Sequence, residues 1–217
     1  MLPTYYTVNQ EGSDEQIIQK SRFIGYVKRV ETEEEAQAFI EQIKKKHYDA
    51  THNCSAYVIG EHDQIQKAND DGEPSGTAGV PILEVIKKQG LKDTAVVVTR
   101  YFGGIKLGAG GLIRAYGSTA SLAIKTTGIV KRQLNRELSV TVDYPLLGKV
   151  ENALRQSKYL LKDILYMENV EFLVYVEVDQ VKAFKEWLID LTNAQAVIEE
   201  RDVTYVETEV ESTHEGS

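Results

Sequence analysis

The sequence predicts an α+β protein with two domains, of which the second is ferredoxin-like. Apolar residues recur at helical spacing in some segments and alternate at strand spacing in others. The last six predicted elements follow the order βαββαβ, which is the ferredoxin-like split unit. Charge also divides the chain, because residues 1–132 hold 17 Lys+Arg and 16 Asp+Glu, whereas residues 133–217 hold 8 and 17. We therefore expect domains at 1–132 and 133–206, followed by an acidic flexible tail at 207–217.

The first domain is predicted to contain strands and helices in alternation. Thr32 and Glu35 have the spacing of a capping box, so a helix begins there. Ser75 or Thr77 is expected to cap the next helix. The other elements, in order along the chain, are strands at 20–30, 54–59 and 64–68, a helix at 78–89, a strand at 94–99 and a helix at 109–126.

The second domain has clearer patterns. Leu138, Val140 and Val142 alternate with polar residues, as in a half-buried strand. Pro145 begins a helix, because proline is tolerated in a first turn. A second helix at 181–191 carries apolar residues at helical spacing. Strands are predicted at 159–167, 170–178 and 196–206, and the boundary with the first domain is expected near 130–136.

Composition narrows the class of protein. Hydrophobic residues make up 42% of the chain and charged residues 27%, as in globular proteins. The single cysteine, Cys54, allows no intrachain disulfide and suits a reducing compartment. The sequence has no signal-peptide pattern and no long apolar segment, so we expect a cytoplasmic protein without a membrane partner. The net charge of −8 argues against gross attraction to nucleic acid, but the first domain can still present a basic patch.

The clearest functional signal is a concentration of glycine. Ten of the 16 glycines lie between Gly72 and Gly117, although the interiors of helices and strands disfavour glycine. In residues 99–117 a strand leads into a glycine-rich loop and then a helix, whose unpaired amides attract anions. Cations and aromatic rings accompany these glycines, which favours a site for phosphate or nucleic acid. The alternative is a tight connection that needs glycine only for packing.

Two common glycine motifs do not fit this loop. Gly103 and Gly108 have Walker A spacing, but Ala109 and Gly110 stand where that motif requires Lys and Ser/Thr. A dinucleotide fingerprint that starts at Gly108 requires a glycine at the position of Ile113. Ordinary P-loop and Rossmann sites are therefore disfavoured.

A second candidate segment carries three acidic residues. Asp70, Asp71 and Glu73 supply carboxylate oxygens of the kind that Mg²⁺ prefers. They can also cap the helix that follows, or pair with Arg100 or Arg114. We expect these structural roles, and no metal or other cofactor.

The residues around Cys54 include two further polar candidates. His52 and Asn53 are possible hydrogen-bond donors beside the glycine-rich loop. Cys54 begins a predicted strand, and a cysteine in that position is usually buried as a small hydrophobe. One cysteine and scattered histidines cannot form a zinc set. No catalytic residue is predicted.

Three motifs in this order resemble the YigZ/IMPACT family: ATHNCSAY at 50–57, DDGEPSGTAGVPIL at 70–83 and VVVTRYFGGIKLGAGGLIRAY at 96–116. The resemblance implies that the first domain has a ribosomal-protein domain-2-like fold with a left-handed βαβ crossover. It also implies that the second domain is the ferredoxin-like domain that bacterial members append. Eukaryotic members modulate translation under amino-acid starvation, so the resemblance implies translation regulation and a stress response.

The resemblance further implies a surface cleft suited to nucleic acid or the ribosome. Within it we expect Arg100, Lys106 and Arg114 to contact phosphates, and Tyr101 or Phe102 to stack a base. Carried over to this sequence, the cleft contains Asp71, Glu73, Ser75, Gly76, Thr77, Arg100, Tyr101, Phe102, Gly103, Gly104, Lys106, Leu107, Gly108, Gly110, Gly111, Arg114 and Tyr116.

Three functions are open at this point. The first, which we favour, is a non-enzymatic translation-associated protein that binds RNA or the ribosome through the basic glycine-rich cleft. The second is an enzyme that binds a nucleotide or phosphometabolite with the glycine-rich loop and Mg²⁺. The third is a regulator of translation that acts through a protein partner, without nucleic acid.

Overall fold

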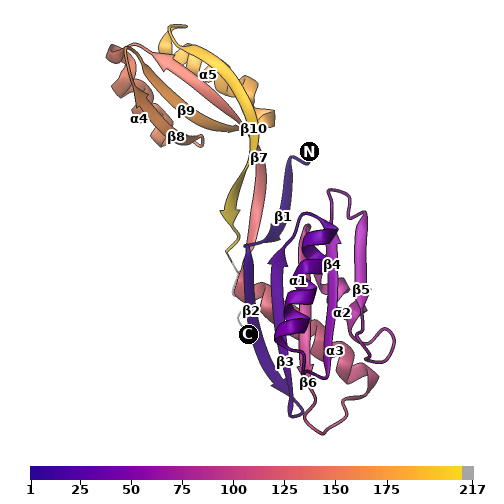
Figure 1. Ribbon diagram of the computed structural model, residues 1–217. Helices are drawn as coiled ribbons and strands as arrows, with labels where there is room; N and C mark the ends of the chain where they lie inside the picture. The colour runs from indigo at the N-terminus through magenta and orange to yellow at the C-terminus, as the bar shows by residue number, and fades with distance from the viewer. Residues whose placement is uncertain (212–217) are drawn as a thin grey trace. The chain divides into compact units, whose positions relative to one another are not determined.

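The computed structural model describes residues 1–211 and divides into two compact units (Figure 1). Of the described residues, the N-terminal unit comprises Tyr5–Lys131 and 208–211, and the C-terminal unit comprises Met1–Thr4 and Arg132–Glu207. Both units combine helices with a sheet, which confirms the predicted α+β class. Among the described residues, no helix has the length and apolar character needed to cross a membrane.

The N-terminal unit is built on a five-stranded sheet in which all neighbouring strands are antiparallel. The strand order is β2 (Glu11–Ile18), β3 (Ser21–Arg29), β6 (Thr94–Tyr101), β4 (His52–Ile59) and β5 (Ile65–Asn69). The strands predicted at 20–30, 54–59, 64–68 and 94–99 are therefore confirmed, including the hairpin of β4 and β5.

Helices cover both faces of this sheet. Side chains alternate between the faces of a strand, so Ala95 and Val97 of β6 pack with α1 (Glu33–Lys46) in one core cluster. Val96 and Val98 belong to the other cluster, which contains α2 (Gly79–Lys88) and α3 (Gly108–Thr127). The sheet thus separates α1 from α2 and α3 (Figure 1).

The topology contains a left-handed crossover. The connections β3–α1–β4 and β5–α2–β6 each join two parallel strands, because both strands are antiparallel to the one between them. Strands β3 and β5 run in opposite directions, and the two connections also cross the sheet in opposite directions. A half-turn about an axis perpendicular to the sheet therefore relates the two connections, and they would have the same hand if their helices lay on the same face. Their helices lie on opposite faces, and therefore the two crossovers have opposite hands. This confirms the left-handed βαβ unit, a rare feature in proteins.

The helix caps follow the prediction in one case and differ in the other. Thr32 accepts a hydrogen bond from the amide of Glu35 at 3.2 Å, as a capping box requires. The prediction that Ser75 or Thr77 caps α2 is wrong, because Asp70 takes that role. Its carboxylate accepts from the amides of residues 76, 78 and 79 at 2.9, 3.2 and 2.8 Å.

Two strands were absent from the predicted set, β1 (Thr4–Val8) and β2. Strand β2 lies at the edge of its sheet and faces α3 through polar side chains. Asp14 accepts from Thr126, and Gln16 donates to Ser118 and Thr119. An apolar alternation therefore does not mark this strand in the sequence.

The C-terminal unit has the predicted βαββαβ order. Its strand order is β10-β7-β9-β8, and β1 also pairs with β7. The strands are β7 (Ile129–Val142), β8 (Leu160–Tyr166), β9 (Val170–Glu177) and β10 (Val197–Glu209). The helices are α4 (Leu147–Gln156), which follows the 3₁₀ turn η1 (Tyr144–Leu146), and α5 (Val181–Thr192), which follows the 3₁₀ turn η2 (Val178–Gln180). Strand β10 continues three residues into the predicted tail, and residues 212–217 of that tail lie outside the described residues.

We expect Asp70→Ala to lower the free energy of unfolding by about 1–2 kcal/mol, because α2 loses its cap. Burial alone would raise the pKa of Asp70, but the three amide donors outweigh it and hold the pKa below its usual value. The stabilising contribution is therefore complete above about pH 4 and is lost as the pH falls through the native pKa. Urea unfolding at several pH values measures both effects.

The control for this experiment is Asp202→Ala, because Asp202 is an exposed residue of β10. It should change stability by less than about 0.5 kcal/mol at any of these pH values. Equal losses in the two variants would contradict the capping role of Asp70.

Candidate functional site

A buried ion pair lies among the motif residues. Nη1 of Arg100 donates to Oε1 of Glu73 at 2.7 Å, and the Tyr116 hydroxyl donates to the same oxygen at 2.6 Å. Arg100 is 5% exposed and Glu73 8%. A buried carboxylate needs a charge partner and hydrogen bonds to offset the loss of water. Arg100 and Tyr116 supply both.

The other nitrogens of Arg100 hold the turn between β2 and β3. Nε and Nη2 donate to Oγ of Ser21 at 3.4 and 3.3 Å, and the amide of Gly103 donates to the same oxygen at 3.2 Å. The guanidinium carbon also lies 5.4 Å from the ring centres of both Phe23 and Phe102. The guanidinium of Arg100 is therefore bound by other groups of the protein. This geometry gives Arg100 a positioning role, whereas its charge alone suggests a phosphate contact.

The neighbouring acidic residues are also engaged within the protein. Asp70 caps α2. Oδ2 of Asp71 accepts from the amide of Asn53 at 2.7 Å, and its Oδ1 lies 3.7 Å from Nζ of Lys44. In residues 1–211, no group of three or more His, Cys, Asp or Glu side chains is arranged to hold a metal ion. These carboxylates act as structural partners.

His52 lies next to the ion pair, whereas the side chain of Asn53 points to the other face of β4. Nδ1 of His52 donates to the carbonyl of Asp71 at 2.8 Å, which leaves Nε2 3.7 Å from Oε2 of Glu73. Nδ2 of Asn53 donates to the carbonyl of His47 at 3.2 Å. The His52 side chain therefore helps to fix the segment that carries the acidic residues, whereas Asn53 contacts that segment through its backbone amide.

Cys54 is fully buried, as its position in a strand predicts. Its thiol donates to the carbonyl of Asp70 at 3.0 Å. Burial raises the pKa of this thiol to about 12. Because the thiolate is the nucleophilic form of cysteine, Cys54 has a structural role.

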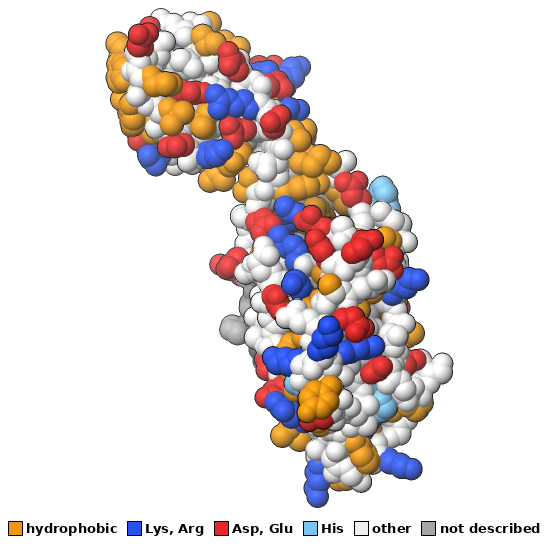
Figure 2. Space-filling view, viewed as in Figure 1, with side chains coloured by type: hydrophobic (Ala, Val, Ile, Leu, Met, Phe, Trp, Pro, Cys, Tyr) orange, Lys and Arg blue, Asp and Glu red, His pale blue; other side chains and the backbone are white. Residues whose placement is uncertain are grey.

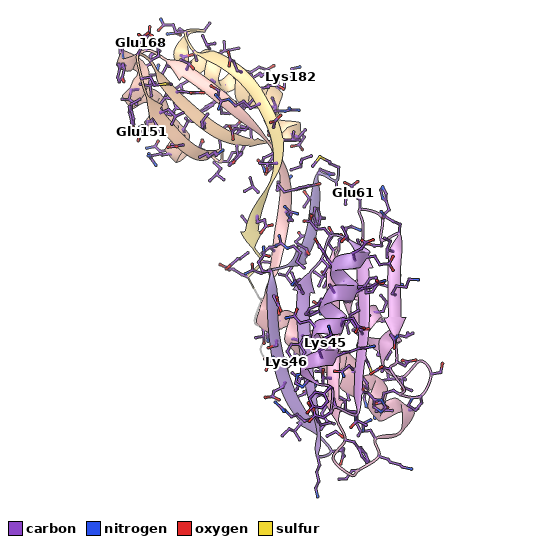
Figure 3. The ribbon with its side chains drawn as sticks, in the orientation of Figure 1. Lys45, Lys46, Glu61, Glu151, Glu168 and Lys182 are labelled. Atoms are coloured by element: carbon purple, nitrogen blue, oxygen red, sulfur yellow. The ribbon has the colours of Figure 1, made fainter. Side chains whose placement is uncertain are left out.

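Tyr101 faces away from the ion pair, because neighbouring residues of a strand point to opposite faces. Its hydroxyl donates to Asp49 at 3.1 Å and lies 2.7 Å from Nδ1 of His47. Nε2 of His47 lies 2.5 Å from the hydroxyl of Tyr26. The ring centre of Tyr26 is 5.1 Å from Nζ of Lys46, the last residue of α1, which is labelled in Figure 3. Burial, together with nearby positive charge, lowers the pKa of His47. Tyr101 is therefore committed to this network.

The glycine-rich loop, residues 102–107, connects β6 to α3. A Cβ at Gly103 would lie 2.0 Å from the carbonyl oxygen of Lys20, so only glycine allows the loop to touch the β2–β3 turn. Gly108 opens α3 with a φ of 71°, which other residues rarely adopt. Helix α3 has no side-chain cap and no acidic residue in its first turn. Its free amides and the helix dipole therefore keep a positive potential at this end.

A hollow of about 430 Å³ lies beside this loop, and we call it the α3 hollow. Lys106 and Arg114 are exposed cations on it, and no acidic residue lines it. Phe102, at the start of the same loop, is 47% exposed. The lining comes from the β2–β3 turn, the loop and α3, and consists of Ile18, Gln19, Ile105, Lys106, Leu107, Gly111, Arg114, Ala115 and Ser118.

The predicted site residues thus divide into two groups. Those that are buried or held by internal contacts are Asp71, Glu73, Thr77, Arg100, Tyr101, Gly103 and Tyr116, together with His52 and Asn53. Those on the surface are Ser75, Gly76, Phe102, Gly104, Lys106, Gly108, Gly110 and Arg114, with Leu107 and Gly111 partly exposed.

Sequence reasoning missed the residues of the β2–β3 turn. Ser21 and Phe23 reach Arg100 only because β3 lies beside β6, with Phe23 opposite Arg100. Ile18 and Gln19 reach the α3 hollow through the same pairing. The residue types of this turn do not indicate a role at the site. Only the register of β3 against β6 shows that the turn lies beside Arg100 and the α3 hollow.

We expect Glu73→Gln to lower the free energy of unfolding by about 3–5 kcal/mol, because it leaves the buried guanidinium of Arg100 without a charge partner. Glu15→Gln is the matched control. Glu15 pairs with Arg22 at 2.5 Å, but both side chains are 50% exposed, so water screens that pair. The urea midpoint should fall in the first variant and change little in the second. Similar midpoints in both variants would contradict the central role of the buried pair.

Comparisons with known proteins agree with this architecture. Residues 19–124 match the family model described as the Impact N-terminal domain, and residues 140–195 match a domain of unknown function (DUF1949). A solved structure, "Crystal structure of an hypothetical protein", has a TM-score of 0.59 and 30% identity, over 91% of this chain and 97% of that chain.

Curated relatives cover most of the chain. IMPACT family member YvyE of Bacillus subtilis (strain 168) is 61% identical over 210 residues, 97% of each chain. IMPACT family member YigZ of Escherichia coli (strain K12) is 35% identical over 177 residues, 81% of this chain and 87% of that protein. The Protein IMPACT homolog of Dictyostelium discoideum is 39% identical over 111 residues, 49% of this chain and 30% of that protein. The chain therefore belongs to the IMPACT family.

Proposed function

We propose that this protein is a non-enzymatic, translation-associated protein that binds single-stranded RNA or the ribosome through the surface formed by the glycine-rich loop and the first turns of α3. One observation carries the proposal. The acidic residues of the neighbouring motif are all used inside the protein, whereas Lys106 and Arg114 line a hollow that has no acidic residue. A positive surface of this kind attracts phosphate groups.

Phosphate binding is supported by two kinds of donor. Lys106 and Arg114 supply exposed side-chain charge. The uncapped start of α3 adds backbone amides, with glycines at positions 108, 110 and 111 that allow a ligand to approach closely. Figure 2 shows acidic and basic side chains interspersed over much of the N-terminal unit in that view. The phosphate contacts are therefore proposed for this loop and not for a large basic patch on the face that Figure 2 shows.

Base stacking is supported by Phe102. Its ring is 47% exposed and lies on the buried guanidinium of Arg100 at 5.4 Å. Arg100 therefore holds the ring at the surface, where a base can stack on it. Of the two aromatic residues predicted for this role, Tyr101 is occupied by His47 and Asp49.

The two alternative functions have less support. An enzyme with Mg²⁺ would draw on Asp70, Asp71 or Glu73, and each of these carboxylates already has internal partners. A regulator that acts through a protein partner is distinguished by co-purification that survives nuclease treatment. The family's eukaryotic members make translation the expected process.

We expect Phe102→Ala to weaken binding of a labelled single-stranded RNA by about 1–3 kcal/mol, the usual value of a base stacked on an aromatic residue. Arg114→Gln should weaken binding and reduce the slope of log K against log salt by roughly 0.7, because one phosphate contact is lost. Fluorescence anisotropy over a salt series measures both quantities. Co-sedimentation with ribosomes tests the same variants on the larger partner.

The controls are matched in type and exposure. Tyr166→Ala removes an aromatic side chain that is 59% exposed in the C-terminal unit. Lys125→Gln removes an exposed cation from the last turn of α3. Both should bind RNA nearly as the unmodified protein does. The proposal fails if the unmodified protein binds neither RNA nor ribosomes at low salt.

A further inference from the structure

The inner lining of the α3 hollow is apolar. Ala115 is 1% exposed, and Ile18 and Leu107 are partly buried against the core of the N-terminal unit. The more exposed lining residues, which form its rim, are polar or charged apart from Ile105. An apolar interior with a few polar groups at its edge is typical of small-molecule sites. The interior suits the flat face of an aromatic group such as a base.

The rim combines positive charge with neutral hydrogen-bonding groups. Lys106 and Arg114 provide the charge, and Gln19 and Ser118 provide an amide and a hydroxyl. A Cβ built on Gly110 would lie 3.3 Å from Nη1 of Arg114, which places this guanidinium over the first turn of α3. The position suits an anionic group that is attached to the base.

The wall that faces α3 is held in a fixed conformation. Gln19 and Lys20, between β2 and β3, have φ values of 48° and 64°, which is unusual for residues other than glycine or asparagine. The contact of Lys20 with Gly103 and the hydrogen bonds of Ser21 keep this turn in place. Strain of this kind persists where the surroundings enforce it. The hollow is thus formed before a ligand arrives.

We infer that the α3 hollow holds one nucleoside phosphate, with its base on the apolar interior and its phosphate at Lys106 and Arg114. The volume of about 430 Å³ lies within the usual range for pockets that take small molecules. The inference rests on the proposed function, in which the nucleoside phosphate is an unstacked nucleotide of single-stranded RNA. A free nucleotide has the same chemistry and is distinguished by the experiment.

The test compares an oligoadenylate RNA with adenosine 5′-monophosphate as probes. Ser118→Leu places a larger side chain at the mouth of the hollow and should weaken binding of the RNA about tenfold or more, as expected for the loss of one stacked base. Ser121→Leu makes the same change at another exposed position of α3 that does not line the hollow, and should change binding less than about twofold. Anisotropy with the RNA and calorimetry with the nucleotide give the affinities.

A second pair of variants protects the test against misfolding, because Ser118 accepts a hydrogen bond from Gln16 that leucine cannot accept. Arg114→Gln should weaken both probes, and Lys125→Gln should leave adenosine 5′-monophosphate unaffected. Thermal melting of each variant confirms that the fold is kept.

The outcomes separate the two proposals. If Ser118→Leu binds the RNA as tightly as Ser121→Leu while Arg114→Gln still weakens binding, the hollow is not the nucleotide site and the proposed RNA function stands. If only adenosine 5′-monophosphate binds and both variants abolish it, the hollow is a site for free nucleotides and the proposed RNA function is overturned. If neither probe binds the unmodified protein at low salt, both proposals are overturned.

Discussion

The ion pair of Glu73 and Arg100 is the interaction on which the rest of the N-terminal site depends. It joins the acidic segment to β6, and through Ser21 and Tyr116 it also reaches the β2–β3 turn and α3. The free energy lost when two charges are removed from water offsets most of the free energy gained from their attraction, so such a pair contributes little net stability. Its consequence here is geometric, because the two side chains of one ion pair join four segments.

This pair also determines how charge is distributed in the site. The first 132 residues are close to neutral, which gives no sign of a positive surface. Glu73 is buried against a guanidinium, and the partly exposed Asp70 and Asp71 are hydrogen-bonded to helix amides and to the amide of Asn53. Lys106 and Arg114 keep their exposure. A local positive surface therefore arises from the internal pairing of acidic groups and not from composition.

Sequence patterns predicted most of the fold because most elements have an apolar face. The left-handed crossover came from the family resemblance, since hydrophobic periodicity contains no information on handedness. Strand β2 escaped prediction because Asp14 and Gln16 make polar contacts with α3. The sequence offered Ser75, Thr77 and the acidic residues as caps of α2 and did not single out Asp70, whose carboxylate reaches across nine residues to the amide of Gly79.

The sequence named many of the residues that lie around the glycine-rich loop, but not the contacts that these residues make. Residue type indicates that Arg100 can bind phosphate, but only the register of β3 against β6 shows that Ser21 and Phe23 enclose it. The same limit applies to the aromatic pair. Tyr101 and Phe102 are equivalent candidates in the sequence, and the alternation of the strand sends one of them to His47.

The C-terminal unit shows why the positive site belongs to the other unit. Glu137, on the sheet face opposite the helices, pairs with Lys162 at 2.6 Å and Arg201 at 3.5 Å, and Ser139 donates to Glu171 at 2.6 Å on the same face. These particular charges balance one another, but residues 133–217 as a whole carry a net charge of −9. An acidic unit repels polyanions, so it opposes indiscriminate binding to nucleic acid. The RNA contacts that we propose therefore depend on the shape and local charge of the glycine-rich loop and the α3 hollow, which favours a specific ligand over a general one.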